Sequence, residues 1–210
     1  MSLALDLGVL VATFAIIFPA ELPDKSFIAT LVLATRYPRP WVWLGATLAF
    51  GIQMVIAVAA GQVLSLLPRT LVLGVTAVLF GAGALVLIRG GLRAKADEEA
   101  DEAQEEAEIA ARATPGERGL AAFATTFAVI FTAEWGDLTQ LIAAGQAART
   151  DSPLSVFLGS WGALTMVAGL GVLAGSWLQK RVPLWRVRLI SGALLAVLAV
   201  ITVVELVRGA

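Results

Sequence analysis

Two short stretches of this sequence place pairs of carboxylates inside long apolar runs. Glu21 and Asp24 lie three residues apart in Glu-Leu-Pro-Asp-Lys-Ser, and Glu134 and Asp137 repeat that spacing in Glu-Trp-Gly-Asp-Leu-Thr. A charge in such surroundings costs several kcal/mol unless it is paired, hydrated or used in a function. Because residues three apart share one face of a helix, each pair is expected to converge on one place. The pattern indicates a site for cations.

Other oxygen-bearing side chains accompany the acids. Ser26 and Thr139 each follow an Asp by two residues, and Gln140 and Gln53 add possible amide oxygens. The sequence contains neither Cys nor His, which excludes thiolate and imidazole ligation and His-based acid/base catalysis. Oxygen ligands suit hard divalent cations such as Mn²⁺ or Ca²⁺. Hydrogen bonding between helices is the rival explanation for these four polar residues, and Gln146 and Thr165 are interpreted as packing residues.

The elements that carry these residues are expected to be membrane helices. Of the 210 residues, 59% are hydrophobic, and the mean hydropathy is +0.86. A span needs about 20 residues to cross about 30 Å of hydrocarbon. Six apolar segments of sufficient length can be marked, at 5–34, 41–66, 70–89, 119–148, 154–178 and 185–207. The fold class expected is an all-α integral membrane protein with six transmembrane helices.

The first and fourth segments are longer than a straight crossing requires, and each holds its acidic motif near the centre. Pro19 and Pro23 remove backbone donors and crowd the preceding turn, so they are expected to break or kink the first helix. Gly136 is expected to loosen the fourth helix in a milder way. Carbonyl groups released at such breaks could serve as additional ligands.

The two halves of the chain are related in sequence. Aligning residues 14–24 with 127–137 gives seven identities in eleven positions without a gap. A unit of three spans is therefore duplicated, at 1–95 and 119–210, and an odd number of spans inverts the second copy in the membrane. If these inverted repeats pack about a pseudo-two-fold axis, the four acids meet near the bilayer midplane. Four carboxylates brought together cannot all remain ionised without cations, so they require a metal ion or protons.

The segment 96–118 between the halves is strongly acidic. Eight of the 16 acidic residues lie between Asp97 and Glu108, and we expect a solvated, mobile linker there. A role in gathering cations or in regulation is the less favoured alternative. Eleven basic residues lie in this linker and in the loops on the same side, against three on the other side. The positive-inside rule then places the linker in the cytoplasm and both termini outside.

These features predict a secondary transporter. Metal ions and protons would replace one another on the carboxylates, and rocking of one repeat against the other would give alternating access. Lys25, whose counterpart is Leu138, either pairs with an acid when the metal is absent or only balances charge. The partners expected are a divalent cation, protons and the lipid bilayer. No nucleic-acid partner, prosthetic group or oligomeric partner is required.

At these motifs the sequence resembles the six-span Mn²⁺/Ca²⁺:H⁺ exchangers once catalogued as uncharacterised protein family 0016, which carry two Glu-x-Gly-Asp-Lys/Arg-Thr/Ser motifs. The likeness covers essentially the whole chain. It is carried by Glu21, Asp24, Lys25 and Ser26 in the first motif and by Glu134, Gly136, Asp137 and Thr139 in the second. Pro23 replaces the Gly of the first motif and Leu138 the basic residue of the second, which is similar to the bacterial manganese-exporter branch. The resemblance implies export of Mn²⁺ in exchange for protons across a bacterial-type cytoplasmic (inner) membrane.

Three alternatives remain beside Mn²⁺ export. The first is a Ca²⁺/H⁺ antiporter of the same architecture. The second is an intramembrane aspartyl protease, because Trp135-Gly136-Asp137 superficially resembles a Gly-Asp catalytic motif. Each Asp here is accompanied by a Glu in a repeated unit, and hydrolysis by a pair of Asp residues does not require such Glu residues. No enzymatic activity is therefore expected. The third is a structural membrane protein whose acids only hold the helices together.

Overall fold

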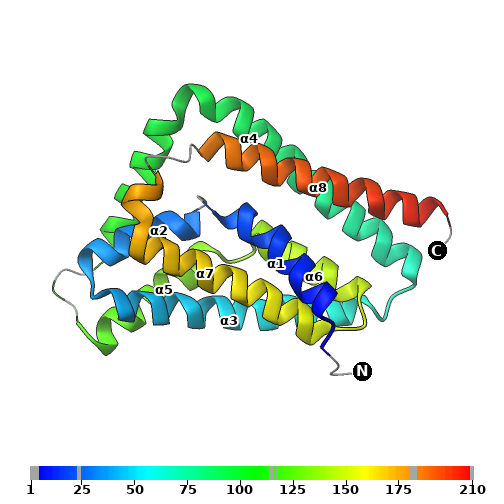
Figure 1. The fold of residues 1–210 in the computed structure, drawn as a ribbon, viewed down its shortest axis with the longest axis horizontal. Helices are drawn as coiled ribbons and strands as arrows, with labels where there is room; N and C mark the ends of the chain where they lie inside the picture. The colour runs from blue at the N-terminus through cyan, green and yellow to red at the C-terminus, as the bar shows by residue number, and fades with distance from the viewer. Residues whose placement is uncertain (1–4, 23–24, 114–115, 117, 180–183, 209–210) are drawn as a thin grey trace.

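The computed structural model describes residues 5–22, 25–113, 116, 118–179 and 184–208, and this part of the chain contains helices and connecting turns (Figure 1). Some side chains inside the helices also lie outside the description, that of Lys25 among them. The helices are α1 (Leu7–Glu21), α2 (Lys25–Arg36), α3 (Arg39–Leu64), α4 (Arg69–Arg112), α5 (Leu120–Ala133), α6 (Leu138–Arg149), α7 (Pro153–Gln179) and α8 (Leu184–Val207).

The first helical unit of each half is broken at its acidic motif, as predicted. Helix α1 includes Pro19 but continues to Glu21, and the axis then bends by 66° into the helix that follows. In the second half α5 ends at Ala133 and α6 begins at Leu138. Gly136, at φ +78°, lies in this second break, in a backbone region that L side chains rarely adopt. The glycine therefore shapes the break directly, a stronger effect than the mild loosening expected.

Each broken unit packs against the long helix of the other half. Helix α1 and α2 pack on α7, α5 and α6 pack on α3, and α3 and α7 contact each other. The closest approaches are equivalent in the two halves. A Cβ added at Gly45 would lie 2.7 Å from the carbonyl oxygen of Phe123, and one at Gly159 would lie 2.5 Å from that of Leu10. The halves are therefore interlocked, and each repeats the packing of the other.

Helices α4 and α8 lie side by side along one flank of this arrangement (Figure 1). The segment 96–118, expected to be a solvated linker, is helical as far as Arg112, as the continuation of α4. Its last turn packs on the core through Ile109, which is 7% exposed, and through Ala113. The expectation of a fully solvated segment is wrong at this end, because the turn presents apolar residues after the acidic run ends.

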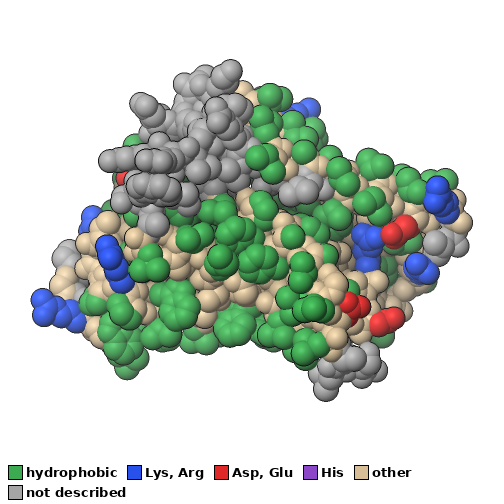
Figure 2. Space-filling model, in the orientation of Figure 1, with side chains coloured by type: hydrophobic (Ala, Val, Ile, Leu, Met, Phe, Trp, Pro, Cys, Tyr) green, Lys and Arg blue, Asp and Glu red, His purple; other side chains and the backbone are tan. Residues whose placement is uncertain are grey.

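The surface and the helix lengths suit a membrane. Among the described residues, three helical stretches are long and apolar enough to cross a bilayer, namely Arg39–Leu64, Arg69–Leu92 and Pro153–Leu173, and the bent α1 and α2 pair can form a fourth. Shorter apolar stretches are Leu120–Ala133 and Leu195–Val207. Hydrophobic side chains cover much of the visible face (Figure 2). The two termini lie at one end of the molecule, together with the α3–α4 and α6–α7 turns (Figure 1).

Candidate metal centre

The two helix breaks meet at Glu21. This last residue of α1 is 2% exposed, and its Oε2 accepts a hydrogen bond of 2.6 Å from the Ser26 hydroxyl. Its Oε1 accepts a hydrogen bond from the hydroxyl of Thr139, a residue of the other half. Ser26 and Thr139 are themselves 1% and 2% exposed. The structure therefore brings three of the predicted site residues, from both repeats, into one buried cluster.

The helix breaks explain why the sequence places these groups together. Ser26 is the second residue of α2, and Thr139 is the second residue of α6, at the equivalent position of the other repeat. The first turn of a helix has backbone N–H groups without partners inside the helix, and it carries the positive end of the helix dipole. Two such turns next to one carboxylate stabilise its negative charge in the apolar interior. An unbroken span would offer no helix N-terminus at this depth.

Glu134, the counterpart of Glu21, is also buried, at 4% exposure. It lies at the C-terminal end of α5, and its carbonyl oxygen accepts hydrogen bonds of 2.6 Å from the Gln140 side chain and 3.3 Å from the backbone N–H of Asp137. Gln140 Oε1 in turn accepts a bond of 3.3 Å from the N–H of Gly136. Both ends of the Gln140 amide thus hold the second break in shape, and its service as a metal ligand stays a prediction.

Asp137 is partly buried and caps α6. Its Oδ1 accepts a hydrogen bond of 2.9 Å from the backbone N–H of Gln140. A cap of this kind typically stabilises a helix by about 1 kcal/mol. The residue therefore has a local structural role, and ligation of a cation would use the carboxylate in addition to that role.

The long helix α3 fixes the end of α5. Gln53 is 1% exposed, and its Nε2 donates a hydrogen bond of 3.0 Å to the carbonyl oxygen of Phe131. This bond joins the two repeats two residues before the end of α5. Thr165, interpreted as a packing residue, accepts a bond of 3.1 Å from the Trp43 indole at its carbonyl oxygen. Gln146 lines a cavity at the far end of α6.

The remaining predicted site residues are not placed. Asp24 and the side chain of Lys25 lie outside the described residues. Within the part of the chain that is described, no three acidic side chains lie close enough together to hold a metal ion. Convergence of all four acids therefore stays a prediction. The direct contact of both hydroxyls with Glu21 was not predicted from the sequence, although the equal spacing of Ser26 and Thr139 after the two Asp residues indicates their equivalence.

The cluster has the chemistry of a switchable cation site. A hydroxyl group both donates and accepts, so Ser26 and Thr139 can satisfy Glu21 by donation and can rotate to present oxygen lone pairs beside it. Carboxylate and hydroxyl oxygens are ligands for hard divalent cations. Because Thr139 belongs to the other repeat, any relative movement of the repeats alters this set of oxygens.

Comparison with known proteins gives consistent matches. The profile of the family described as "Divalent cation/proton antiporter GDT1" matches residues 9–95 and 122–210. A GDT1-like protein of Synechocystis sp. is 30% identical over 197 residues, covering 91% of this chain and 94% of the relative. The chloroplastic protein PAM71 of Arabidopsis thaliana is 35% identical over 214 residues, covering 93% of this chain but 56% of the relative. No solved structure matches the chain.

Proposed function

Since the chain belongs to the GDT1 family of divalent cation/proton antiporters, we propose that it exports Mn²⁺ from the cytoplasm in exchange for protons. The observation that carries this proposal is the buried Glu21 carboxylate, held by hydroxyls from both repeats at the two helix breaks. Family membership makes the protein a transporter rather than an enzyme, which sets aside the intramembrane protease.

The exchange uses one set of oxygens for two kinds of cation. With a proton on the site, Glu21 is neutral and its burial is tolerated without a metal ion. With Mn²⁺ bound, Glu21 is ionised, and Ser26 and Thr139 turn their lone pairs toward the ion. The other predicted ligands are Asp24, Glu134, Asp137 and Gln140, which complete an oxygen shell once the repeats close around the ion.

The proposed arrangement in the membrane is six spans as two inverted repeats of three. The interlocked packing of α1 on α7 and of α5 on α3 supports the repeats, since each half presents the same elements to the other. In the proposed orientation both termini lie outside the inner membrane and the acidic segment is cytoplasmic. The chain is proposed to build the site without a second copy, because both motifs belong to one polypeptide.

The Lys25 ammonium group is proposed to take part in charge balance. Its two possible roles, as a tethered competitor for the carboxylates or as a fixed neutralising charge, predict different behaviour of a Lys25→Met variant. A competitor that is removed leaves tighter Mn²⁺ binding. If Lys25 instead only neutralises charge, its removal leaves the carboxylates with one more uncompensated negative charge, and more protons are needed in each transport cycle.

Reconstituted liposomes test the function. Purified protein with an imposed proton gradient is expected to move Mn²⁺ against its concentration gradient, and the Glu21→Gln variant is expected to lose this transport. Glu108→Gln, which removes an exposed acid of α4, is the matched control and should transport like the parent. Wild-type transport by Glu21→Gln, or by the Asp24→Asn and Glu134→Gln variants, would refute the site.

Ca²⁺ is the second candidate cation, because its preferred ligands are the same hard oxygens. The same liposomes offered Mn²⁺ and Ca²⁺ together decide between the two. Preferential uptake of Ca²⁺ at equal concentrations would replace manganese in the proposal and leave the exchange mechanism intact.

A further inference from the structure

A polar cavity of about 910 Å³ lies at the end of the molecule that carries the α3–α4 and α6–α7 turns. Its walls come from both halves of the chain, including the last turn of α6 and the end of α8. The polar residues that matter here are Gln62, Gln146, Arg149, Asp151 and Glu205. None of them belongs to the two acidic motifs, and the exchange chemistry described above does not use them.

Helix α6 connects this cavity to the Glu21 cluster. Thr139, Ala143 and Gln146 are spaced by four and three residues, so they lie along one face of the helix. Thr139 donates to Glu21 at one end of that face, and Gln146 lines the cavity at the other, about 10 Å away at 1.5 Å per residue. Ala143, between them, is 0% exposed. The cavity is therefore aligned with the cluster but separated from it by packed side chains.

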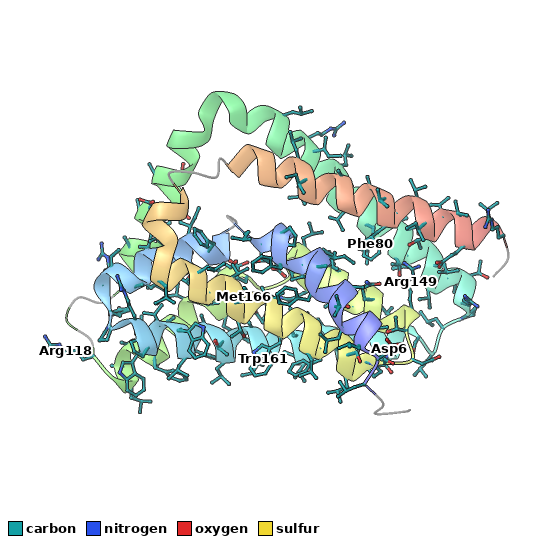
Figure 3. The ribbon with its side chains drawn as sticks, in the orientation of Figure 1. Asp6, Phe80, Arg118, Arg149, Trp161 and Met166 are labelled. Atoms are coloured by element: carbon teal, nitrogen blue, oxygen red, sulfur yellow. The ribbon has the colours of Figure 1, made fainter. Side chains whose placement is uncertain are left out.

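An ion pair holds the cavity end of α6 against α8. Arg149 Nη2 lies 2.7 Å from Glu205 Oε2, and Arg149 Nη1 donates a hydrogen bond of 2.7 Å to the Thr202 hydroxyl. The side chains of the pair are 14% and 36% exposed. Figure 3 shows Arg149 at the end of α6, facing the neighbouring helices α4 and α8. Ion pairs with this much solvent access are weak, so the bond can break in every transport cycle.

At the equivalent end of the other broken unit, the described residues include no such ion pair. Arg36 ends α2 as Arg149 ends α6, eleven residues after the first residue of its helix in both cases. Arg36 is exposed, and no acidic side chain among the described residues lies within ion-pair distance of it. Among the side chains that the structure describes, the same residue type at equivalent positions is thus ion-paired at one end of the molecule and exposed at the other. Alternating access in inverted repeats requires an asymmetry of this kind.

We propose that the cavity is the extracytoplasmic vestibule of the transport path and that the Arg149–Glu205 ion pair is the latch that closes it toward the Glu21 site. The inference rests on the proposed transport function and membrane orientation. Release of Arg149 frees the end of α6, and Ala143 then becomes accessible from the vestibule.

Cysteine labelling tests the latch, because the chain contains no native Cys. The Gln146→Cys variant is expected to react with a membrane-impermeant maleimide added outside right-side-out vesicles. The Ala143→Cys variant is expected to react slowly, and adding Arg149→Gln should raise its labelling rate about three- to fivefold, the upper part of the range for loss of a partly exposed ion pair. Adding Arg36→Gln instead, the matched control, should leave that rate unchanged.

Exchanging the charges of Arg149 and Glu205 distinguishes loss of the ion pair from misfolding. The double variant Arg149→Glu with Glu205→Arg should return labelling of Ala143→Cys toward its parent rate. Labelling of Gln146→Cys only from the cytoplasmic side, or from neither side, would overturn the vestibule. An unchanged Ala143→Cys rate in the Arg149→Gln background would overturn the latch. Labelling needs no Mn²⁺, so failure of manganese transport with the expected labelling pattern refutes the proposed cation and not the gate.

Discussion

Thr139→Val removes one hydroxyl from the buried Glu21 carboxylate while leaving the side-chain volume almost unchanged. In the structure that hydroxyl donates to Glu21 Oε1 from the opposite repeat, and Ser26 supplies the donor to Oε2. A hydrogen bond to a charged group contributes about 1.5–3 kcal/mol, and 1.4 kcal/mol corresponds to a factor of ten in binding. If the hydroxyl also serves as a ligand oxygen, the loss falls on the Mn²⁺-bound form. We expect Mn²⁺ affinity to fall about 10- to 100-fold.

The assay is Mn²⁺ binding to purified protein by titration calorimetry, supported by the KM for Mn²⁺ in proteoliposomes. Thr139→Ser keeps the hydroxyl and is expected to bind within about threefold of the parent. Thr132→Val is a second control, because the Thr132 hydroxyl donates only within its own helix. Its hydrogen bond to the carbonyl oxygen of Ala128 is 2.8 Å long. Unchanged affinity in Thr139→Val, or an equal loss in Thr139→Ser, would refute the assignment of this hydroxyl to the site.

Two further predictions concern the backbone. Gly45→Ala and Gly159→Ala each place a Cβ against a backbone carbonyl, so each should destabilise the fold by about 1–3 kcal/mol. The measurement is the melting temperature in detergent, which should fall. Gly74→Ala is the control, because a Cβ there has nothing within 4 Å and should leave the melting temperature unchanged. A fall in melting temperature for Gly74→Ala equal to the others would show that the effect is not steric. Gly136→Ala should lower the stability of the fold by about 1–2 kcal/mol, because Gly136 has a positive φ, and it should also slow transport. Asn tolerates that backbone region better than Ala, so Gly136→Asn should have smaller effects on both the melting temperature and the transport rate. Equal behaviour of the two variants would mean that the second break does not depend on this backbone conformation.

Much of the site can be predicted from the sequence, because the spacing of its residues and the backbone preferences near them are local properties of the chain. The spacing of Glu21 and Ser26 and the seven shared positions between the motifs fix which residues are equivalent in the two repeats. Proline and glycine near the acids predict the breaks, since their backbone preferences act within one turn. The apolar composition predicts the membrane class, and the family match agrees with that interpretation.

The extent of the helices was less well predicted. The acidic segment reads as a linker because its like charges repel, yet α4 runs through it to Arg112, and Ile109 is buried. Favourable helix propensity of Ala and Glu, together with docking of one apolar turn, outweighs the repulsion there. Composition alone gives no measure of that docking.

The residue types at the site, their equivalence between repeats and the positions of the breaks can all be predicted from the sequence. The folded arrangement was needed to show that Ser26 and Thr139 share one acid, Glu21, and that Arg149 pairs with Glu205 while Arg36 is exposed. A repeat in sequence encodes the same local geometry twice, whereas contacts between helices depend on how the two copies cross. Two copies in different surroundings therefore pair Arg149 with Glu205 and leave Arg36 exposed.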